Sequence, residues 1–93
     1  MAMKILELAI KKYGKQPQLN MAIEEMSELT KEICKYMRGN NNHDQLVEEL
    51  ADVYITLKQV RMICGIEDKE IAKVKREKID RLYERILKDE LHK

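Results

Sequence analysis

The sequence predicts a single all-α domain. The chain of 93 residues has one proline, three glycines and neither Phe nor Trp, a composition that offers little to a β-sandwich or a barrel. Hydrophobic residues make up 44% and charged residues 38%, the balance expected of amphipathic helices. A domain this small buries only a modest part of its surface alone, so self-association is plausible from the outset.

Three glycines divide the chain into helices, because Gly14, Gly39 and Gly65 each follow a segment with helical periodicity. The predicted helices are about residues 3–13, 18–38, 43–64 and 67–88. A turn that carries Pro17 separates the first two, and either Asn42 or Asp44 can cap the third. The pattern favours a four-helix-bundle-like domain.

The two central segments each carry acids beside an apolar stripe when the residues are stepped at about 100°. In residues 18–38, Glu25 lies at one margin of the stripe and Glu28 lies next to it. The stripe itself comprises Leu19, Ala22, Ile23, Met26, Leu29, Ile33 and Met37. In residues 43–64, Glu49 and Asp52 flank a 4-3 apolar seam on one side, while Glu48 points nearly the opposite way. The seam comprises Leu46, Leu50, Val53, Leu57, Val60 and Cys64.

The last predicted helix is unusual because basic residues interrupt its apolar arc. Lys78 falls in the middle of that arc, with Lys75, Arg81 and Arg85 close by. The arc comprises Ile71, Val74, Ile79, Leu82 and Ile86. Long basic side chains can extend out of an apolar seam into water, and this is the default interpretation. The other is that they face an anionic group inside the bundle.

Charge and cysteine content narrow the function classes. A net charge of +1 provides no global field toward nucleic acid or an anionic membrane. The N-terminal segment MAMKILELAIKKYG is too short and too interrupted for a secretory or membrane segment, so a cytoplasmic protein is expected. Cys34 and Cys64 form no CxxC motif and fall at apolar positions, which predicts buried, reduced thiols.

The paired acids are the main candidate for a functional site. If the two central helices pack together, Glu25, Glu28, Glu49 and Asp52 can bring four carboxylates into one pocket. Unpaired, these groups would repel one another, whereas Mg²⁺, or Mn²⁺ in its place, would hold them ionised. The alternative is an ordinary solvated face, since Glu28 and Lys31 are spaced for a surface ion pair.

The spacing of these acids resembles a known signature. Glu24-Glu25-x-x-Glu28 followed by Glu49-x-x-Asp52 looks like the EExxE…ExxD pattern of the MazG-like all-α nucleoside triphosphate pyrophosphohydrolases. The stretches YGKQPQLNMAIEEMSEL and LVEELADVYITLKQVRMICGI are also similar to the family, and the resemblance covers about residues 13–85. The chain most resembles the compact members found in bacteria and their phages.

The resemblance implies Mg²⁺-dependent hydrolysis of an NTP or dNTP to the monophosphate and pyrophosphate. It implies metal ligands at Glu25, Glu28, Glu49 and Asp52, and catalytic roles at Glu24 and Glu28. Glu24 would be a supporting ligand or would help to position the water. Candidates for binding the triphosphate are Lys75, Lys78 and Arg81. Gln18 either contacts the base or sugar, as the resemblance implies, or is a polar residue facing water at a helix start.

Two further expectations concern the base and the assembly. With no Trp or Phe, stacking on a base would use a tyrosine, although tyrosines at these spacings also suit the margin of a core; they are Tyr13, Tyr36, Tyr54 and Tyr83. The resemblance implies a homodimer or homotetramer whose second subunit completes the bundle. The alternative function is a catalytically inactive nucleotide-sensing or helical oligomerisation module, while near-neutral charge speaks against nucleic-acid binding.

Overall fold

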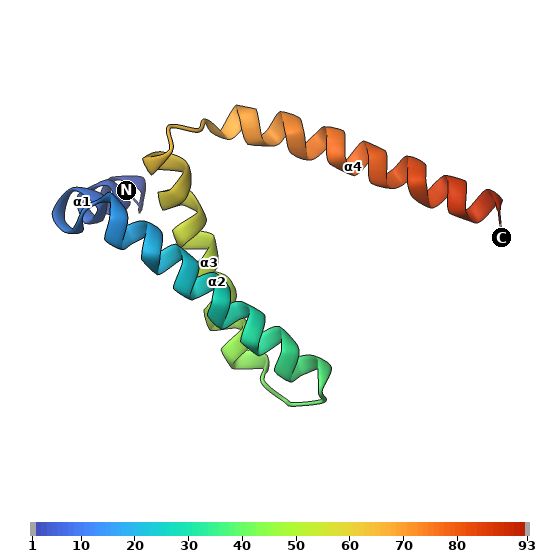
Figure 1. Ribbon diagram of the computed structural model, residues 1–93, viewed down its shortest axis with the longest axis horizontal. Helices are drawn as coiled ribbons and strands as arrows, with labels where there is room; N and C mark the ends of the chain where they lie inside the picture. Colours follow the sequence, from blue (N-terminus) through green and yellow to red (C-terminus); the bar gives the residue numbers. More distant parts are fainter. Residues whose placement is uncertain (1, 93) are drawn as a thin grey trace.

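The computed structural model describes residues 2–92, and within this range the chain is all-α with four helices and no strand (Figure 1). The helices are α1 (Ala2–Tyr13), α2 (Lys15–Met37), α3 (His43–Ile63) and α4 (Asp68–Leu91). The predicted all-α class and the number of helices are therefore confirmed, while the four-helix bundle remains a prediction. None of the helices in the described range has the length and apolar character required to cross a membrane.

The centre of the fold is an antiparallel hairpin of α2 and α3 (Figure 1). Ala22 on α2 is 1% exposed and Val53 on α3 is 7% exposed, so each arm contributes a small or medium apolar side chain to the buried interior of the hairpin. The hairpin also buries polar side chains, among them Gln18, Thr56 and Gln59. A core that contains so many polar groups requires defined hydrogen bonds, because an unsatisfied buried polar group is costly.

The short helix α1 packs against the open end of the hairpin, where α2 begins and α3 ends. Gly14 joins α1 to α2 with a φ of 94°, a conformation that only glycine adopts without strain. The predicted turn at Pro17 is wrong, because α2 already begins at Lys15 and includes Pro17 in its first turn. Proline is tolerated there since the first backbone N–H groups of a helix have no partner within the helix.

The closed end of the hairpin is held by Asn42, the residue that precedes α3. Its Nδ2 donates to the backbone carbonyl of Glu32 at 2.9 Å and to Glu32 Oε1 at 3.1 Å. Lys35 Nζ approaches Glu32 Oε2 at 3.2 Å. Asn42 thus occupies the predicted capping position but uses its side chain to tie α3 to α2, with no side-chain cap hydrogen bond at the start of α3.

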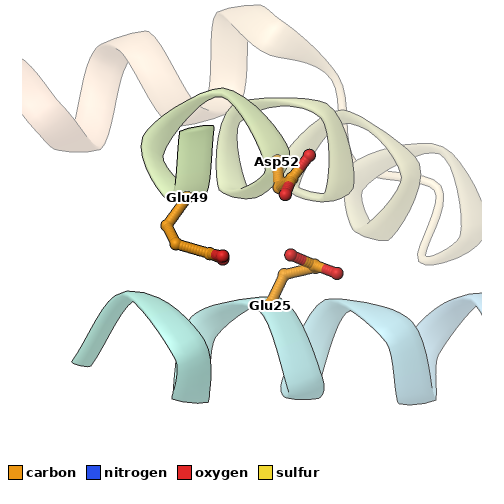
Figure 2. A group of neighbouring side chains, drawn as sticks. All are labelled: Glu25, Glu49 and Asp52. Carbon is orange, nitrogen blue, oxygen red and sulfur yellow. The ribbon is translucent and has the colours of Figure 1, made fainter. Parts of the chain in front are cut away.

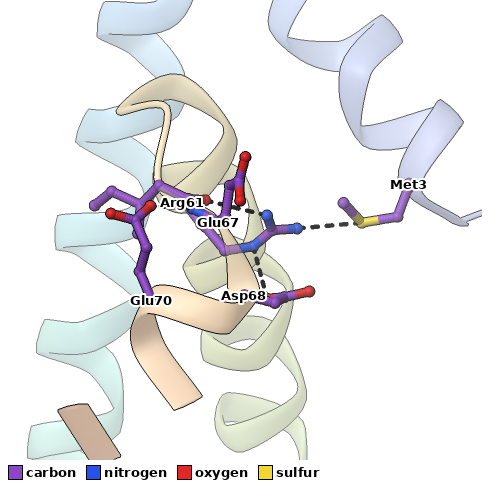
Figure 3. Close-up of polar contacts among 6 residues, drawn as sticks. Met3, Arg61, Glu67, Asp68 and Glu70 are labelled. Carbon is purple, nitrogen blue, oxygen red and sulfur yellow. Dashed lines mark hydrogen bonds and ion pairs between the residues drawn. The ribbon is translucent and has the colours of Figure 1, made fainter. Parts of the chain in front are cut away.

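The junction between α3 and α4 is built around Arg61 (Figure 3). Its guanidinium donates to the Ile66 carbonyl at 3.2 Å, forms an ion pair with Asp68 at 3.1 Å and lies 4.0 Å from the sulfur of Met3. Glu67 then caps α4 in a capping box with Glu70, which explains where the helix begins. The start of α4 is therefore defined locally.

Beyond its first residue, α4 extends away from the other helices and packs against none of them (Figure 1). The radius of gyration is 17.2 Å, whereas a compact domain of this length would have about 12 Å. A single chain therefore forms a three-helix unit with a projecting fourth helix. The apolar arc of α4, including Ile79 and Leu82, is exposed.

The prediction of buried thiols is wrong, since Cys34 and Cys64 are both free and exposed. Periodicity places a residue on the apolar face of a helix, but burial also requires a neighbouring element that covers that face. At these two positions no other helix of the described chain does so. The same reason explains the exposure of apolar residues such as Ile33 and Leu57.

Candidate functional site

Three acids from the two arms of the hairpin meet in its middle (Figure 2). Glu25 comes from α2, while Glu49 and Asp52 come from adjacent turns of α3 and face it across the gap between the helices. One carboxylate oxygen from each residue lies within 4.8 Å of the others. The predicted placement of Glu49 and Asp52 on one face, without Glu48, is confirmed by this geometry.

The acid cluster of Glu25, Glu49 and Asp52 is electrostatically strained. Burial, and then the neighbouring charges of Asp52 and Glu49, raises the pKa of Glu25 above its ordinary value of 4.5. Glu49 Oε2 is buried and has no hydrogen-bond partner in the described chain. An all-oxygen group with an unsatisfied carboxylate oxygen has the ligand chemistry that a hard divalent cation requires.

A cleft of about 520 Å³ adjoins the acid cluster, and Glu25 and Asp52 form part of its lining. The cleft lies at the open end of the hairpin, where α1 meets α2 and α3. Its other walls are mainly apolar, with Tyr13, Met21 and Ile55 contributing large side chains. Its volume and apolar lining with a few polar groups are typical of a small-molecule site.

Two buried glutamines supply polar groups within this cleft. Gln18 from α2 and Gln59 from α3 are each 5% exposed, and Gln59 Nε2 donates a hydrogen bond to Gln18 Oε1. Among the described residues, Gln18 Nε2 meets only the weakly accepting sulfur of Met21, at 3.7 Å. Thr56, which also lines the cleft, donates to the Val53 carbonyl at 3.1 Å. Gln18 therefore does not face bulk water.

The expected pocket of four carboxylates contains three in the structure, because Glu28 lies outside the group. Glu28 and Glu24 are both exposed on α2, on either side of Glu25 in the sequence. A fourth like charge would add repulsion where Glu25 is already disfavoured as an anion. The roles predicted for Glu24 and Glu28 remain predictions.

The predicted phosphate-binding residues lie apart from the acid cluster within one chain. Lys75, Lys78 and Arg81 are all exposed on α4, which packs against neither α2 nor α3. Arg81 Nε donates to the Glu77 carbonyl of its own helix, at 3.5 Å. A single chain therefore does not bring these cations to the acids.

Sequence reasoning missed Gln59 and Thr56 as lining residues of the cleft. Gln59 lies seven residues after Asp52, and Gln18 lies seven residues before Glu25. Because seven residues span almost two helical turns, each glutamine falls on the same face as its acid. The signal that could have identified the pair was a polar residue on each arm, seven residues from an acid and on the same face of its helix.

Comparisons of the chain with protein families, curated proteins and solved structures gave no match.

Proposed function

We propose that the protein is a Mg²⁺-dependent nucleoside triphosphate pyrophosphohydrolase of the MazG-like kind, which converts an NTP or dNTP to its monophosphate and pyrophosphate. The observation that carries this proposal is the meeting of Glu25, Glu49 and Asp52 beside a ligand-sized cleft. Acids and cleft together provide a place for a metal–phosphate group and an adjoining place for an organic group. The order of acids in the sequence supports the same assignment.

Glu25, Glu49 and Asp52 would hold the metal, and Mn²⁺ could replace Mg²⁺ because both accept carboxylate oxygens. A bound divalent ion neutralises phosphate charge and lowers the pKa of a coordinated water. Glu24 and Glu28 are exposed on α2, one residue before and three residues after Glu25, and one of these carboxylates would orient the attacking water or accept its proton. The apolar walls of the cleft would exclude water from the other half of the substrate.

The triphosphate also needs cations, and those of α4 would come from a second copy of the chain. The accessible surface is 7975 Å², whereas a compact protein of this mass would expose about 5,700 Å². A protein–protein interface of standard size buries about 800 Å² on each partner. The accessible surface in excess of a compact protein is larger than that, so it could supply one such interface. This surplus supports a homodimer or homotetramer in which Lys75, Lys78 and Arg81 of α4 lie near the acids of a partner.

The activity is tested by measuring monophosphate and pyrophosphate release from the eight common NTPs and dNTPs with Mg²⁺. Asp52→Ala should abolish turnover, because it removes one of the three proposed metal ligands. The matched control is Glu48→Ala, which removes a neighbouring exposed acid outside the cluster and should leave turnover nearly unchanged. Equal losses in the two variants would overturn the assignment of the metal site.

Metal binding has a test of its own, independent of turnover. Without metal, Asp52→Asn should raise the melting temperature, since it removes a like charge that disfavours the Glu25 carboxylate. With Mg²⁺ in excess, the wild-type protein should gain stability and the variant should not. A variant that is less stable than wild type in metal-free buffer would contradict the strain assigned to the cluster.

The exposed face of α4 also favours a second function, a noncatalytic nucleotide-sensing or helical oligomerisation module. Such a module would use the same surfaces for assembly and would not turn over its ligand. Mg²⁺- and nucleotide-dependent stabilisation of the wild-type protein, with no product from any of the eight nucleotides, would favour the module over the enzyme.

A further inference from the structure

The buried glutamine pair has hydrogen-bonding capacity that the protein leaves unused. Each side-chain amide offers two N–H donors and two acceptor lone pairs. Between Gln18 and Gln59, one N–H···O bond is formed, and within residues 2–92 no group donates to Gln59 Oε1. Both amides line the cleft, so their remaining donors and acceptors are available to a ligand there.

The pair is placed at a fixed distance from the acid cluster. Seven residues at 1.5 Å per residue separate the backbone positions of the two glutamines from those of Glu25 and Asp52 by about 10 Å along the helix axes. Because the two arms are antiparallel, both steps lead to the same open end of the hairpin. A ligand with phosphates at the acids and a polar edge at the amides would need about the length of a nucleoside.

The walls between these two polar ends suit a flat ring. Tyr13 projects from α1 with 57% of its surface exposed, and Ile55 lies on α3 with 47% exposed. Both would lose accessible apolar surface if a planar group occupied the cleft, which is the usual source of affinity for a heteroaromatic ring.

We infer that this cleft binds the nucleobase of the substrate, and that the Gln18–Gln59 amide pair hydrogen-bonds to its edge. The inference rests on the proposed function and extends it to the base. Nucleobases present a donor and an acceptor side by side on one edge, and two adjacent amides present the complementary groups.

The pair also determines how strictly the base is selected. Rotating both side-chain amides by 180° reverses the hydrogen bond between them, so that Gln18 donates to Gln59. The same rotation exchanges the N–H donor and the carbonyl acceptor that the two amides present to the cleft. The mutual hydrogen bond survives this inversion. The site therefore accepts a base with an amino group or a carbonyl at the same position, and it distinguishes cytosine from uracil only weakly.

Nuclear magnetic resonance with free nucleosides tests the site without phosphate, metal or turnover. On titration with cytidine or uridine, the side-chain NH₂ resonances of Gln18 and Gln59 should shift. The chain supplies its own control, because Gln16 and Gln45 are exposed and lie outside the cleft, so their resonances should stay in place. Cytidine and uridine should bind with dissociation constants within about threefold of each other.

Substitution supplies the matched test. Gln59→Met keeps the length of the side chain but removes its hydrogen bonds, and should weaken nucleoside binding at least tenfold, whereas Gln45→Met should leave it unchanged. Tyr13→Ala should weaken binding, with Tyr36→Ala, exposed and outside the cleft, as its control. Circular dichroism of each variant establishes that the helices are retained.

The outcomes separate this inference from the proposed function. If Gln59→Met hydrolyses nucleotides with unchanged KM and unchanged base preference, the inferred base site is wrong and the proposed enzymatic activity is retained. Nucleoside binding that depends on Gln59, with no hydrolysis of any nucleotide, would sustain the base site and overturn the enzyme. A preference of more than tenfold between cytidine and uridine would overturn the inversion of the amide pair.

Discussion

The α2–α3 hairpin and α4 are built from helices of nearly equal length, 23, 21 and 24 residues, but they are stabilised differently. The hairpin buries side chains from both arms and depends on contacts between residues far apart in the sequence. No residue of α4 is buried, and its start is fixed by a capping box and one ion pair.

The difference shows that an amphipathic pattern has two separable consequences. It specifies a helix, which α4 forms through local interactions, and it specifies an apolar face, which in α4 no part of the described chain covers. An isolated helix of this length is marginally stable in water. We therefore expect α4 to gain most of its stability from assembly, whereas the hairpin has its stabilising contacts within one chain.

The largest expected effect is on assembly. Leu82→Glu places a charge on the apolar arc of α4 and should shift the protein from a multiple of 11.1 kDa to a monomer in sedimentation or light scattering. The matched control is Leu87→Glu, which makes the same change on the opposite side of the same helix. A monomeric wild-type protein would contradict the assembly and leave α4 as a free helix.

The next effect contrasts one substitution in the two regions. Ala22→Leu adds volume at a position that is 1% exposed and should lower the free energy of unfolding by about 2 kcal/mol. Ala72→Leu makes the same substitution on exposed α4 and should change the free energy of unfolding by less than about 0.5 kcal/mol. Urea denaturation at one protein concentration measures both, and equal losses would mean that α4 is as tightly packed as the hairpin.

A smaller effect is expected at the closed end of the hairpin. Asn42→Asp removes the donor that serves Glu32 and sets two carboxylates together, so we expect a loss of about 2 kcal/mol or less in unfolding free energy. Asn41→Asp introduces the same change at the exposed neighbouring position and should have little effect. If both variants unfold at the same urea concentration, the Asn42 contacts contribute nothing to stability.

The smallest effect is a pH dependence at the same place. The hydrogen bond from Asn42, and then that from Lys35, lowers the pKa of Glu32 below its ordinary value of 4.5. The stability that the Glu32 carboxylate contributes is therefore fully present above that value and is lost as the pH falls through the lower folded pKa. Wild type and Glu32→Gln should converge in stability on acidification, and a constant difference down to pH 3 would refute the assignment.

Much of the fold followed from local sequence. Gly39 and Gly65 end their helices with positive φ angles of 92° and 67°, as glycine does after a helix. Stepping residues around α3 separated Glu48 from Glu49 and Asp52 correctly, because an α-helix has a fixed angular period. The start of α2 was misplaced by three residues, and α4 continues three residues beyond its predicted end near residue 88.

The remainder depended on which helices become neighbours. Gln18 and Gln59 are 41 residues apart, and periodicity alone does not state that two polar residues will meet in a core. Cys34 and Cys64 were expected to be buried because their faces were apolar, yet nothing in the described chain covers them. Lys78 is exposed on α4, which packs against no other helix of the described chain, so neither its periodicity nor the fold of one chain assigns it a partner.

The projection of α4 has a consequence for stoichiometry. Each chain carries one hairpin and one α4, joined through the short segment at Gly65. In any assembly the number of α4 helices therefore equals the number of hairpins that can receive one. If each α4 packs on the hairpin of another copy, every α4 and every hairpin is covered only when the copies close into a ring, and the smallest such ring is a dimer. Dilution would then open every ring and separate the acids from the partner's cations, so cellular abundance itself would set the fraction of complete sites.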